Sequence, residues 1–380
     1  MAPLRARAAL LSALLLAVCV LLARASFAPS TAVADIAATG ASISCFADFN
    51  SDKHTDLATA TVTPAAEAGA VTTSTVQVWL YSPALKQFQP DGPTIVLNGT
   101  VVSMFANDID KDNALEILVF TSADAANADA ANADADNGDV AVEGALTVTM
   151  LRVLELGQAL QVQPVRGFTG DHQPLSVPAA FDYNNDFFPD LIGTAPGGER
   201  RLWSNTGAVS KSGEYIFTAL SHDDTTQFMH RDEQDIPFVQ PSATAFVDLN
   251  GDCLSDVFIF AGNADAPYAE LWLNSNTEPL GSNYVMAREY SFPAGAGAPV
   301  WGDVDADGTL DMVFPVCLPA GGDCSEKSEI HVLYNIQKPM CASMINPGRN
   351  CRGQQNLCTA DASFYFEFPD KEGTFTRNMS

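Results

Sequence analysis

Hydrophobic residues recur along this chain in pairs of short runs that are typical of β-strands. The first run of each pair is rich in apolar and β-branched residues, and the second alternates apolar and polar positions with a period of two. The ten runs are Leu57–Val62 and Val76–Tyr81, Ile117–Phe120 and Leu146–Leu151, Leu191–Thr194 and Arg201–Asn205, Val257–Phe260 and Glu270–Asn274, and Met312–Val316 and Ile330–Asn335. No amphipathic helical run of useful length follows residue 25. The pattern therefore predicts an all-β fold. Trp79, Trp203 and Trp272, with Tyr334, lie in the second runs and are interpreted as one repeated packing position.

A polar segment of nine residues precedes the first run of every pair. The copies read DFNSDKHTD, DIDKDNALE, DYNNDFFPD, DLNGDCLSD and DVDADGTLD. Positions one, three, five and nine carry Asp, Asn or Glu in all five. These residues are Asp48, Asn50, Asp52 and Asp56; Asp108, Asp110, Asp112 and Glu116; Asp182, Asn184, Asp186 and Asp190; Asp248, Asn250, Asp252 and Asp256; and Asp303, Asp305, Asp307 and Asp311.

The spacing of these loops predicts the architecture. They start 55 to 74 residues apart, which suits one small antiparallel sheet per repeat. Radial repetition of four-stranded sheets is the β-propeller arrangement, whereas a β-solenoid has a much shorter period. We expect residues 26–380 to form one propeller of about six or seven blades, five of them with a clear loop. Residues 122–139 read SADAANADAANADADNGD, and this composition predicts a disordered acidic insert at the surface.

The loops have the chemistry of a site for a hard cation. Short oxygen-bearing side chains at alternate positions can point to one centre, with a backbone carbonyl at position seven and the acid at position nine. Such an oxygen shell suits Ca²⁺ better than the smaller, octahedral Mg²⁺. An EF-hand is excluded because position twelve is never Glu and because strands, not helices, follow. We expect all twenty loop side chains to be calcium ligands and the ions to act as structural staples. Lys53 and Phe187 at position six predict weaker sites in the first and third loops.

The N-terminus predicts entry into the secretory pathway, and the net charge limits the kinds of partner. Arg5 and Arg7 precede an apolar run over 8–22, and Ala23-Arg24-Ala25 has the form of a cleavage site. Residues 1–25 are therefore predicted to be a signal peptide, with an uncleaved signal anchor as the alternative. The formal charge is −27, and it becomes −30 without the three arginines of residues 1–25. This charge repels nucleic acid and anionic lipid, but 17 of the 46 acidic residues are predicted ligands.

The cysteines fit an extracellular protein. Seven follow residue 25, and most are expected to be oxidised in that compartment. Five of them lie between 317 and 358, so a Cys-rich loop is predicted over 338–360. The odd number leaves one thiol free or paired outside this chain, and the spacing leaves the connectivity open. Two N-glycosylation sequons, at Asn98 and Asn378, suit the same compartment.

The loop followed by a strand resembles the FG-GAP repeat of integrin α-subunits and the related VCBS repeats. Gly297-Ala298-Pro299 stands just before the fifth loop. Residues 40–370 resemble the T-cell immunomodulatory protein family (integrin-α FG-GAP repeat-containing protein 1, or Linkin). The resemblance implies an extracellular glycoprotein with a propeller, associated with cell adhesion and immune modulation. Family members are type I membrane proteins with a transmembrane anchor downstream of the propeller. The sequence stops at Ser380 without reaching such a segment. We therefore expect the protein to be held at the membrane only by an anchor outside this sequence, or else to be secreted.

Three classes of function are compatible with these features. The first is a non-enzymatic module that binds protein partners at the cell surface, and we favour it. The second is a lectin-like propeller that binds carbohydrate. The third is an enzyme, which we do not expect because none of the five histidines lies in a recognisable catalytic motif. The densest polar cluster, between His222 and Asp232, is interpreted as a surface loop.

Overall fold

The computed structural model describes about two thirds of the chain. The described residues are 40–66, 70–122, 144–154, 159–220, 228, 238, 243–263, 265–275, 284–317, 328–339, 351–352 and 358–367. Several predictions from the sequence lie outside them. These are the signal peptide over 1–25, the insert over 122–139 except for Ser122, the cluster between His222 and Asp232 except for Phe228, the second sequon, and the greater part of the Cys-rich loop over 338–360.

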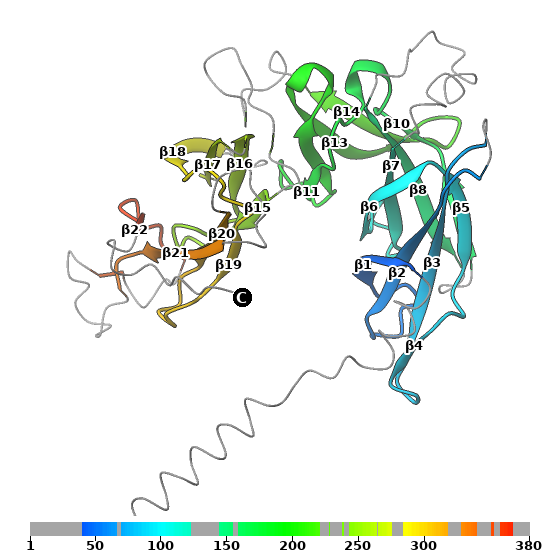
Figure 1. The fold of residues 1–380 in the computed structure, drawn as a ribbon, viewed down its shortest axis with the longest axis horizontal. Helices are drawn as coiled ribbons and strands as arrows, with labels where there is room; N and C mark the ends of the chain where they lie inside the picture. The colour runs from blue at the N-terminus through cyan, green and yellow to red at the C-terminus, as the bar shows by residue number, and fades with distance from the viewer. Residues whose placement is uncertain are drawn as a thin grey trace, which may run out of the picture.

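The described residues form an all-β structure of five separate sheets (Figure 1). The first has the order β1-β2-β3-β4 with β5 also paired to β3, and the others have the orders β6-β7-β8-β9, β10-β14-β13-β12-β11, β15-β16-β17-β18 and β19-β20-β21-β22. Neighbouring strands are antiparallel, except that β10 is parallel to β14. Two short 3₁₀ turns, η1 (Gly170–His172) and η2 (Pro196–Gly198), are the helical elements of the described part.

Each sheet is built from strands that are consecutive in the chain. In the first two sheets the strands are β1 (Ser42–Ala47), β2 (Asp56–Thr63), β3 (Thr73–Ser82), β4 (Gln87–Gln89), β5 (Thr94–Asn98), β6 (Thr100–Asn107), β7 (Glu116–Ser122), β8 (Leu146–Leu154) and β9 (Ala159–Gln163). In the other three they are β10 (Val165–Arg166), β11 (Ala179–Phe181), β12 (Asp190–Thr194), β13 (Arg200–Val209), β14 (Tyr215–Leu220), β15 (Ala245–Val247), β16 (Asp256–Asn263), β17 (Ala266–Asn274), β18 (Tyr284–Ser291), β19 (Val300–Gly302), β20 (Asp311–Cys317), β21 (Ser328–Ile336) and β22 (Tyr365–Glu367). All ten runs predicted from the apolar pattern fall in strands, so the all-β prediction is confirmed.

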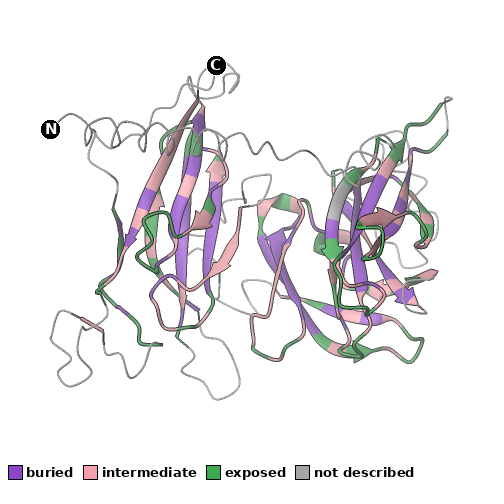
Figure 2. Cartoon of the chain, turned by 90° about the horizontal axis from the view of Figure 1, so that it is seen from below, coloured by how far each residue is buried: buried purple, intermediate pink, exposed green. Residues whose placement is uncertain are grey.

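The hydrophobic core lies between successive sheets. One cluster joins β2 and β3 of the first sheet to β7 and β8 of the second, through side chains that include Val76 and Leu151. Three further clusters join the second sheet to the third, the third to the fourth, and the fourth to the fifth. The central strands are buried along most of their length (Figure 2). Because both faces of an inner sheet are covered, its central strands read as continuous apolar runs rather than as an alternation.

A tryptophan recurs at one register position of the sheets. Trp79, Trp203 and Trp272 lie opposite Leu57, Leu191 and Val257 on the neighbouring strand. All three indoles are at most 6% exposed, which confirms their interpretation as packing residues. The fifth sheet has Leu333 at this position, opposite Met312. The sequence comparison that grouped Tyr334 with the tryptophans was therefore wrong by one residue, which in a strand is the opposite face.

Candidate metal centres

The five acidic loops occupy equivalent places in the five sheets. Each connects an edge strand of a sheet to the neighbouring strand: β1 to β2, β6 to β7, β11 to β12, β15 to β16, and β19 to β20. The acid at position nine is the first residue of that neighbouring strand in every case. We number the loops one to five in chain order. All twenty predicted ligand residues are described, so each can be placed.

The loop backbone has the same unusual conformation in all five copies. Positions four and six have a positive φ in every loop. At position six the φ values are 69° for Lys53, 67° for Asn113, 65° for Phe187, 66° for Cys253 and 86° for Gly308. Most of these residues have a side chain, for which the left-handed region is unfavourable. The bulky residues in loops one and three therefore do not prevent the turn from forming.

Side-chain acceptors at positions one, three and five hold this conformation. In loop one, the Asp52 N–H donates to Asp48 at 3.0 Å and to Asn50 at 3.1 Å. The next N–H, of Lys53, donates to the second oxygen of Asp48 at 2.8 Å, and the His54 N–H donates to Asp52 at 2.8 Å. The other four loops repeat these four bonds residue for residue. Short side chains with oxygen are thus required here by the backbone itself.

The acid at position nine joins the loop to two strands. In loop one, Asp56 accepts the Phe49 N–H at 3.0 Å and the Tyr81 N–H at 2.7 Å. Asp190, Asp256 and Asp311 accept two backbone N–H groups in the same way. Side chains at this position are at most 1% exposed. The sequence predicted only a metal ligand at this position. In the structure the acid is also a buried anchor between the loop and the next strand, which is β3, β13, β17 or β21.

Burial changes the acidity of these anchors. Burial raises the pKa of Asp190 to about 7, although the Asn205 and Tyr183 N–H groups lower it and the nearby Asp186 raises it further. Burial likewise raises the pKa of Asp256 to about 7 and that of Glu116 to about 7. A charged carboxylate is therefore unfavourable in these loops without a nearby cation. The donor set, which is entirely oxygen, fits a hard divalent cation.

Carboxylates converge most closely in three of the five loops. One ligand oxygen from each of three acids lies within 4.8 Å of the others in loops two, three and five. The groups are Asp108, Asp110 and Glu116; Asp182, Asp186 and Asp190; and Asp303, Asp305 and Asp311. The acids of loops one and four do not form such a group among the described residues. The Asn at position three donates its amide to the Asp at position five at 3.1 Å in both of these loops, and Asn184 does the same in loop three at 2.9 Å.

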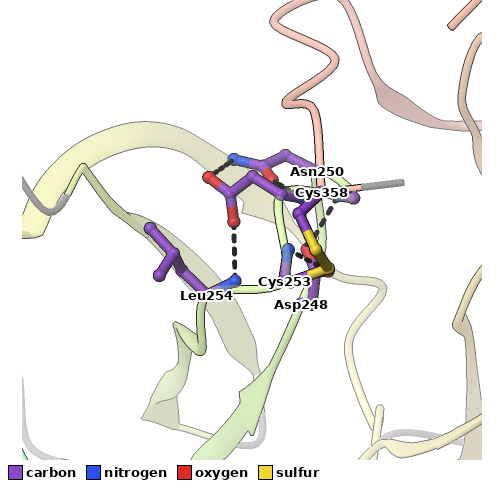
Figure 3. The surroundings of a disulfide bond; sticks show 7 residues. Asp248, Asn250, Cys253, Leu254 and Cys358 are labelled. Carbon is purple, nitrogen blue, oxygen red and sulfur yellow. Dashed lines mark hydrogen bonds between the residues drawn. A yellow bond between two sulfur atoms is a disulfide. The ribbon is translucent and has the colours of Figure 1, made fainter. Parts of the chain in front are cut away.

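Loop four is tied to a distant part of the chain (Figure 3). Cys253, at position six, forms a disulfide with Cys358, 105 residues later. The Asp361 N–H donates to the Asn250 carbonyl at 2.8 Å, and the Gln337 amide donates to the Leu249 carbonyl at 2.9 Å. Cys45 is the free cysteine of the described part, and it is buried. Sequence reasoning missed this connection because Cys253 gave no sign of its partner.

Two residues outside the loops also enter a candidate centre. Arg152 of β8 forms ion pairs with Asp110 and Asp112 of loop two, and Tyr215 of β14 donates its hydroxyl to Asp110 at 2.7 Å. Neither residue belongs to the repeated motif, so no pattern in the sequence pointed to them. Only the register between β7 and β8, which places Arg152 opposite Glu116, reveals the contact.

The sequence of this chain is similar to those of known proteins with related repeats. Residues 248–314, which contain loops four and five, match the FG-GAP-like repeat family. The chain is 29% identical to the T-cell immunomodulatory protein homolog of Plasmodium yoelii yoelii over 346 residues, 87% of this chain and 46% of that protein. The resemblance to the T-cell immunomodulatory protein family is confirmed.

Two further relatives support the same resemblance. The homolog of Plasmodium falciparum (isolate 3D7) is 30% identical over 201 residues, 50% of this chain and 27% of that protein. Protein linkin of Caenorhabditis elegans is 28% identical over 144 residues, 36% of this chain and 22% of that protein. The chain therefore matches less than half of the length of these relatives.

Solved structures give a weaker likeness. A xylan beta-1,4-xylosidase from Bacillus halodurans C-125 aligns at 10% identity and a TM-score of 0.33, over 78% of this chain and 52% of that one. A GH43_1 enzyme from Xanthomonas citri aligns at 9% identity and a TM-score of 0.34, over 83% and 93%. These scores are too low to carry an argument about fold closure or activity. In the described part of the chain, no helix has the length and apolarity that a membrane crossing requires.

Proposed function

We propose that this chain is a non-enzymatic, calcium-binding β-propeller that binds protein partners outside the cell or at its surface. The repeated loop carries the proposal. Five copies share one backbone conformation and one set of hydrogen bonds, and the side chains that make them are oxygen ligands. The names of the relatives, T-cell immunomodulatory protein homolog and linkin, support a role in adhesion or immunomodulation.

The order of the sheets supports a propeller. Successive sheets of about four strands pack face to face through four separate core clusters. Radial closure of such a series leaves only short edges, which protects the sheets from pairing with other chains. We propose that the described sheets are five of about six or seven blades. Side chains repeated on every blade then serve the scaffold, and the surface loops that differ between blades serve recognition.

Calcium is proposed as a structural ion. Loops three and five bring three carboxylates together, and their anchors, Asp190 and Asp311, are buried. Carboxylates this close repel one another, and a divalent cation bound only by the folded state would stabilise that state by mass action. Asp303, Asp305, Asp307 and Asp311 would hold the ion in loop five, and Asp182, Asn184, Asp186 and Asp190 would hold it in loop three. Loops one and four would use their corresponding residues.

Thermal unfolding with calcium and with EDTA tests the metal part of this proposal. We expect the purified chain to melt at a higher temperature with calcium than with EDTA. Asp303→Asn with Asp305→Asn removes two charges from loop five and should reduce the difference. Asp91→Asn, an exposed acid in a turn outside the loops, is the matched control and should leave it unchanged. Equal melting temperatures in both buffers would contradict calcium binding.

A non-enzymatic role is proposed because the acids that could serve in proton transfer are engaged with the backbone. The described histidines lie in different parts of the fold: His54 in loop one, His172 in η1 and His331 in β21. Binding of the labelled chain to cell surfaces, with and without calcium, tests the interaction role. A glycan array distinguishes the lectin-like alternative, which requires exposed aromatic platforms. The recurring Trp79, Trp203 and Trp272 are instead buried.

Three features of the chain support an extracellular location. The signal peptide that the sequence predicts over 1–25 would direct the chain to the secretory pathway. The Cys253–Cys358 disulfide is stable in that compartment. Asn98, in the first sequon, ends β5 and is exposed. Secretion of the expressed chain and a mass shift on enzymatic deglycosylation, reduced in Asn98→Gln, test the location.

A further inference from the structure

Loop two differs from the other four, among the described contacts, because a basic side chain forms ion pairs with its acids. Arg152 lies on β8, opposite Glu116. Its Nη1 lies 3.3 Å from an oxygen of Asp110, its Nη2 contacts Asp112, and its Nε lies 3.9 Å from Glu116 Oε1. One guanidinium therefore faces the acids at positions three, five and nine, which are three of the four side chains proposed to hold an ion.

No other sheet has a cation at this place. If the register of the other sheets is continued by one residue, the positions opposite the ninth loop residue hold Leu80, Ser204, Leu273 and Tyr334. These side chains are neutral. The arginine is thus a feature of the second sheet and not part of the repeat.

The ninth residue of loop two also differs. It is Glu116, whereas the other four are aspartates with a backbone N–H on each oxygen. Glu116 Oε2 accepts the Ile109 N–H at 2.9 Å. Its Oε1 is buried and has no hydrogen-bond partner. One carboxylate oxygen of Glu116 lies within 4.8 Å of ligand oxygens of Asp108 and Asp110. A charged carboxylate with a buried oxygen that lacks a donor is stabilised by a nearby positive charge.

A residue of the next sheet holds the arginine in place. Tyr215 is 7% exposed, donates its hydroxyl to Asp110 at 2.7 Å and accepts from Arg152 Nη1 at 3.0 Å. Arg152, Asp110 and Tyr215 therefore form a closed triangle of contacts. A divalent ion entering loop two would have to displace the guanidinium from two of its partners. The planar fork of arginine suits simultaneous contacts to several carboxylates better than a single point charge does.

We propose that Arg152 is the resident cation of loop two, which folds without calcium and does not bind it as the other loops do. This inference rests on the proposed calcium function for the contrast between loops. The acids of loop two would then be neutralised by an arginine of the same chain, whereas the acids of the other loops would be neutralised by calcium bound from solution. The second blade would then keep its loop ordered at calcium concentrations too low for its neighbours.

Hydrogen exchange measured loop by loop tests this inference. The full chain is compared with calcium and with EDTA, and peptides covering 108–116 and 303–311 are followed. In the wild type, exchange in 303–311 should become about tenfold faster or more in EDTA, and exchange in 108–116 should not change. Arg152→Gln should make exchange in 108–116 depend on calcium. Arg166→Gln, which removes an exposed arginine paired with Glu214, is the matched control and should behave as wild type.

A second measurement covers the case in which Arg152→Gln folds poorly. The number of calcium ions bound per chain is determined by titration calorimetry on variants that keep Arg152 and carry substitutions only in loop five or only in loop two. Asp303→Asn with Asp305→Asn should remove one bound ion, and Asp108→Asn with Asp110→Asn should remove none. Loss of an ion from the loop-two variant, or a response of 108–116 to EDTA equal to that of 303–311 in the wild type, would overturn the inference.

The two proposals fail in different ways. If hydrogen exchange changes in no loop when EDTA replaces calcium, the calcium proposal is wrong. The role of Arg152 is then tested only by hydrogen exchange in the Arg152→Gln variant. Faster exchange of 108–116 in Arg152→Gln, in both buffers, would then support its role as the resident cation. Unchanged exchange in that variant would refute the role.

Discussion

Arg200 and Glu270, 70 residues apart in the sequence, form a fully buried ion pair between the third and fourth sheets. Arg200 Nη2 lies 2.6 Å from Glu270 Oε1, and Nη1 lies 2.7 Å from Oε2. Both side chains are 0% exposed. Trp272 and Tyr268 donate to the same carboxylate at 2.9 and 3.0 Å. The pair therefore satisfies its polar atoms while joining β13 to β17.

Replacing one partner should be costly. In Arg200→Met, Glu270 stays buried without its counter-charge, and we expect a loss of ~3–5 kcal/mol in the free energy of unfolding at neutral pH. Urea unfolding at pH 7 measures this loss. The double replacement Arg200→Met with Glu270→Met removes both charges and should recover a large part of it, since an apolar pair of similar volume fills the same space. A double variant no more stable than the single one would contradict this account.

The same pair predicts a dependence on pH. Burial alone would raise the pKa of Glu270, but the hydrogen bonds and charge of Arg200 and the donors Trp272 and Tyr268 lower it below its ordinary value. A lowered folded-state pKa gives stability that is present above the unfolded-state pKa, near 4.3 for Glu, and is lost as the pH falls through the folded value. The cost of Arg200→Met should therefore be smaller at pH 4 than at pH 7, as urea midpoints at both values can show.

The left-handed positions of the loops predict a stabilising substitution. Ala306, at position four of loop five, has a φ of 63°. A left-handed residue with a side chain costs ~1–2 kcal/mol, and glycine avoids this cost but loses ~0.5–1 kcal/mol in backbone entropy. Ala306→Gly should thus stabilise the chain by ~0.5–1 kcal/mol in urea unfolding with EDTA.

A matched control separates this effect from a general effect of glycine. Ala84 is exposed and does not have a positive φ. Ala84→Gly should lower stability slightly because only the entropy term remains. Equal effects of the two substitutions would show that the conformation of Ala306 is not strained.

The strands and loops could be predicted from the sequence because both depend on local chemistry. Apolar runs such as Val257–Phe260 lie inside strands, and the alternating Asp and Asn side chains bond to the loop backbone within a few residues. The pairing register depends on the neighbouring strand. For that reason Leu333, and not Tyr334, occupies the tryptophan position in the fifth sheet.

The contacts between sheets could not be predicted in this way. Arg152 and Tyr215 are ordinary strand residues in the sequence, and only the register of β8 and the packing of β14 bring them to Asp110. Arg200 and Glu270 likewise meet across a sheet boundary. The acids at position nine were predicted as ligands, but their role as buried anchors depends on N–H groups such as that of Asn274, 18 residues later.

The free cysteine should be chemically inert in the folded chain. Cys45 is 9% exposed and packs in the cluster between the first two sheets. Burial raises the pKa of its thiol to about 12. Because the thiolate is the reactive form, iodoacetamide at pH 8 should leave Cys45 unmodified in the native protein and modify it in guanidinium. Mass spectrometry of the peptide containing Cys45 gives the result, and native labelling at the denatured rate would contradict the burial.

The disulfide at loop four should stabilise the end of the fifth sheet. β22 pairs with β21 through only three residue pairs, and Cys358 lies a few residues before it. Joining Cys253 to Cys358 closes a loop with a sequence separation of 105 residues, and losing such a bond costs ~2–5 kcal/mol. Cys253→Ser with Cys358→Ser should lower stability by this amount and speed hydrogen exchange over 358–367 more than over 116–122. If exchange in 358–367 stays at the wild-type rate, the Asp361–Asn250 and β21–β22 hydrogen bonds hold the segment without the disulfide.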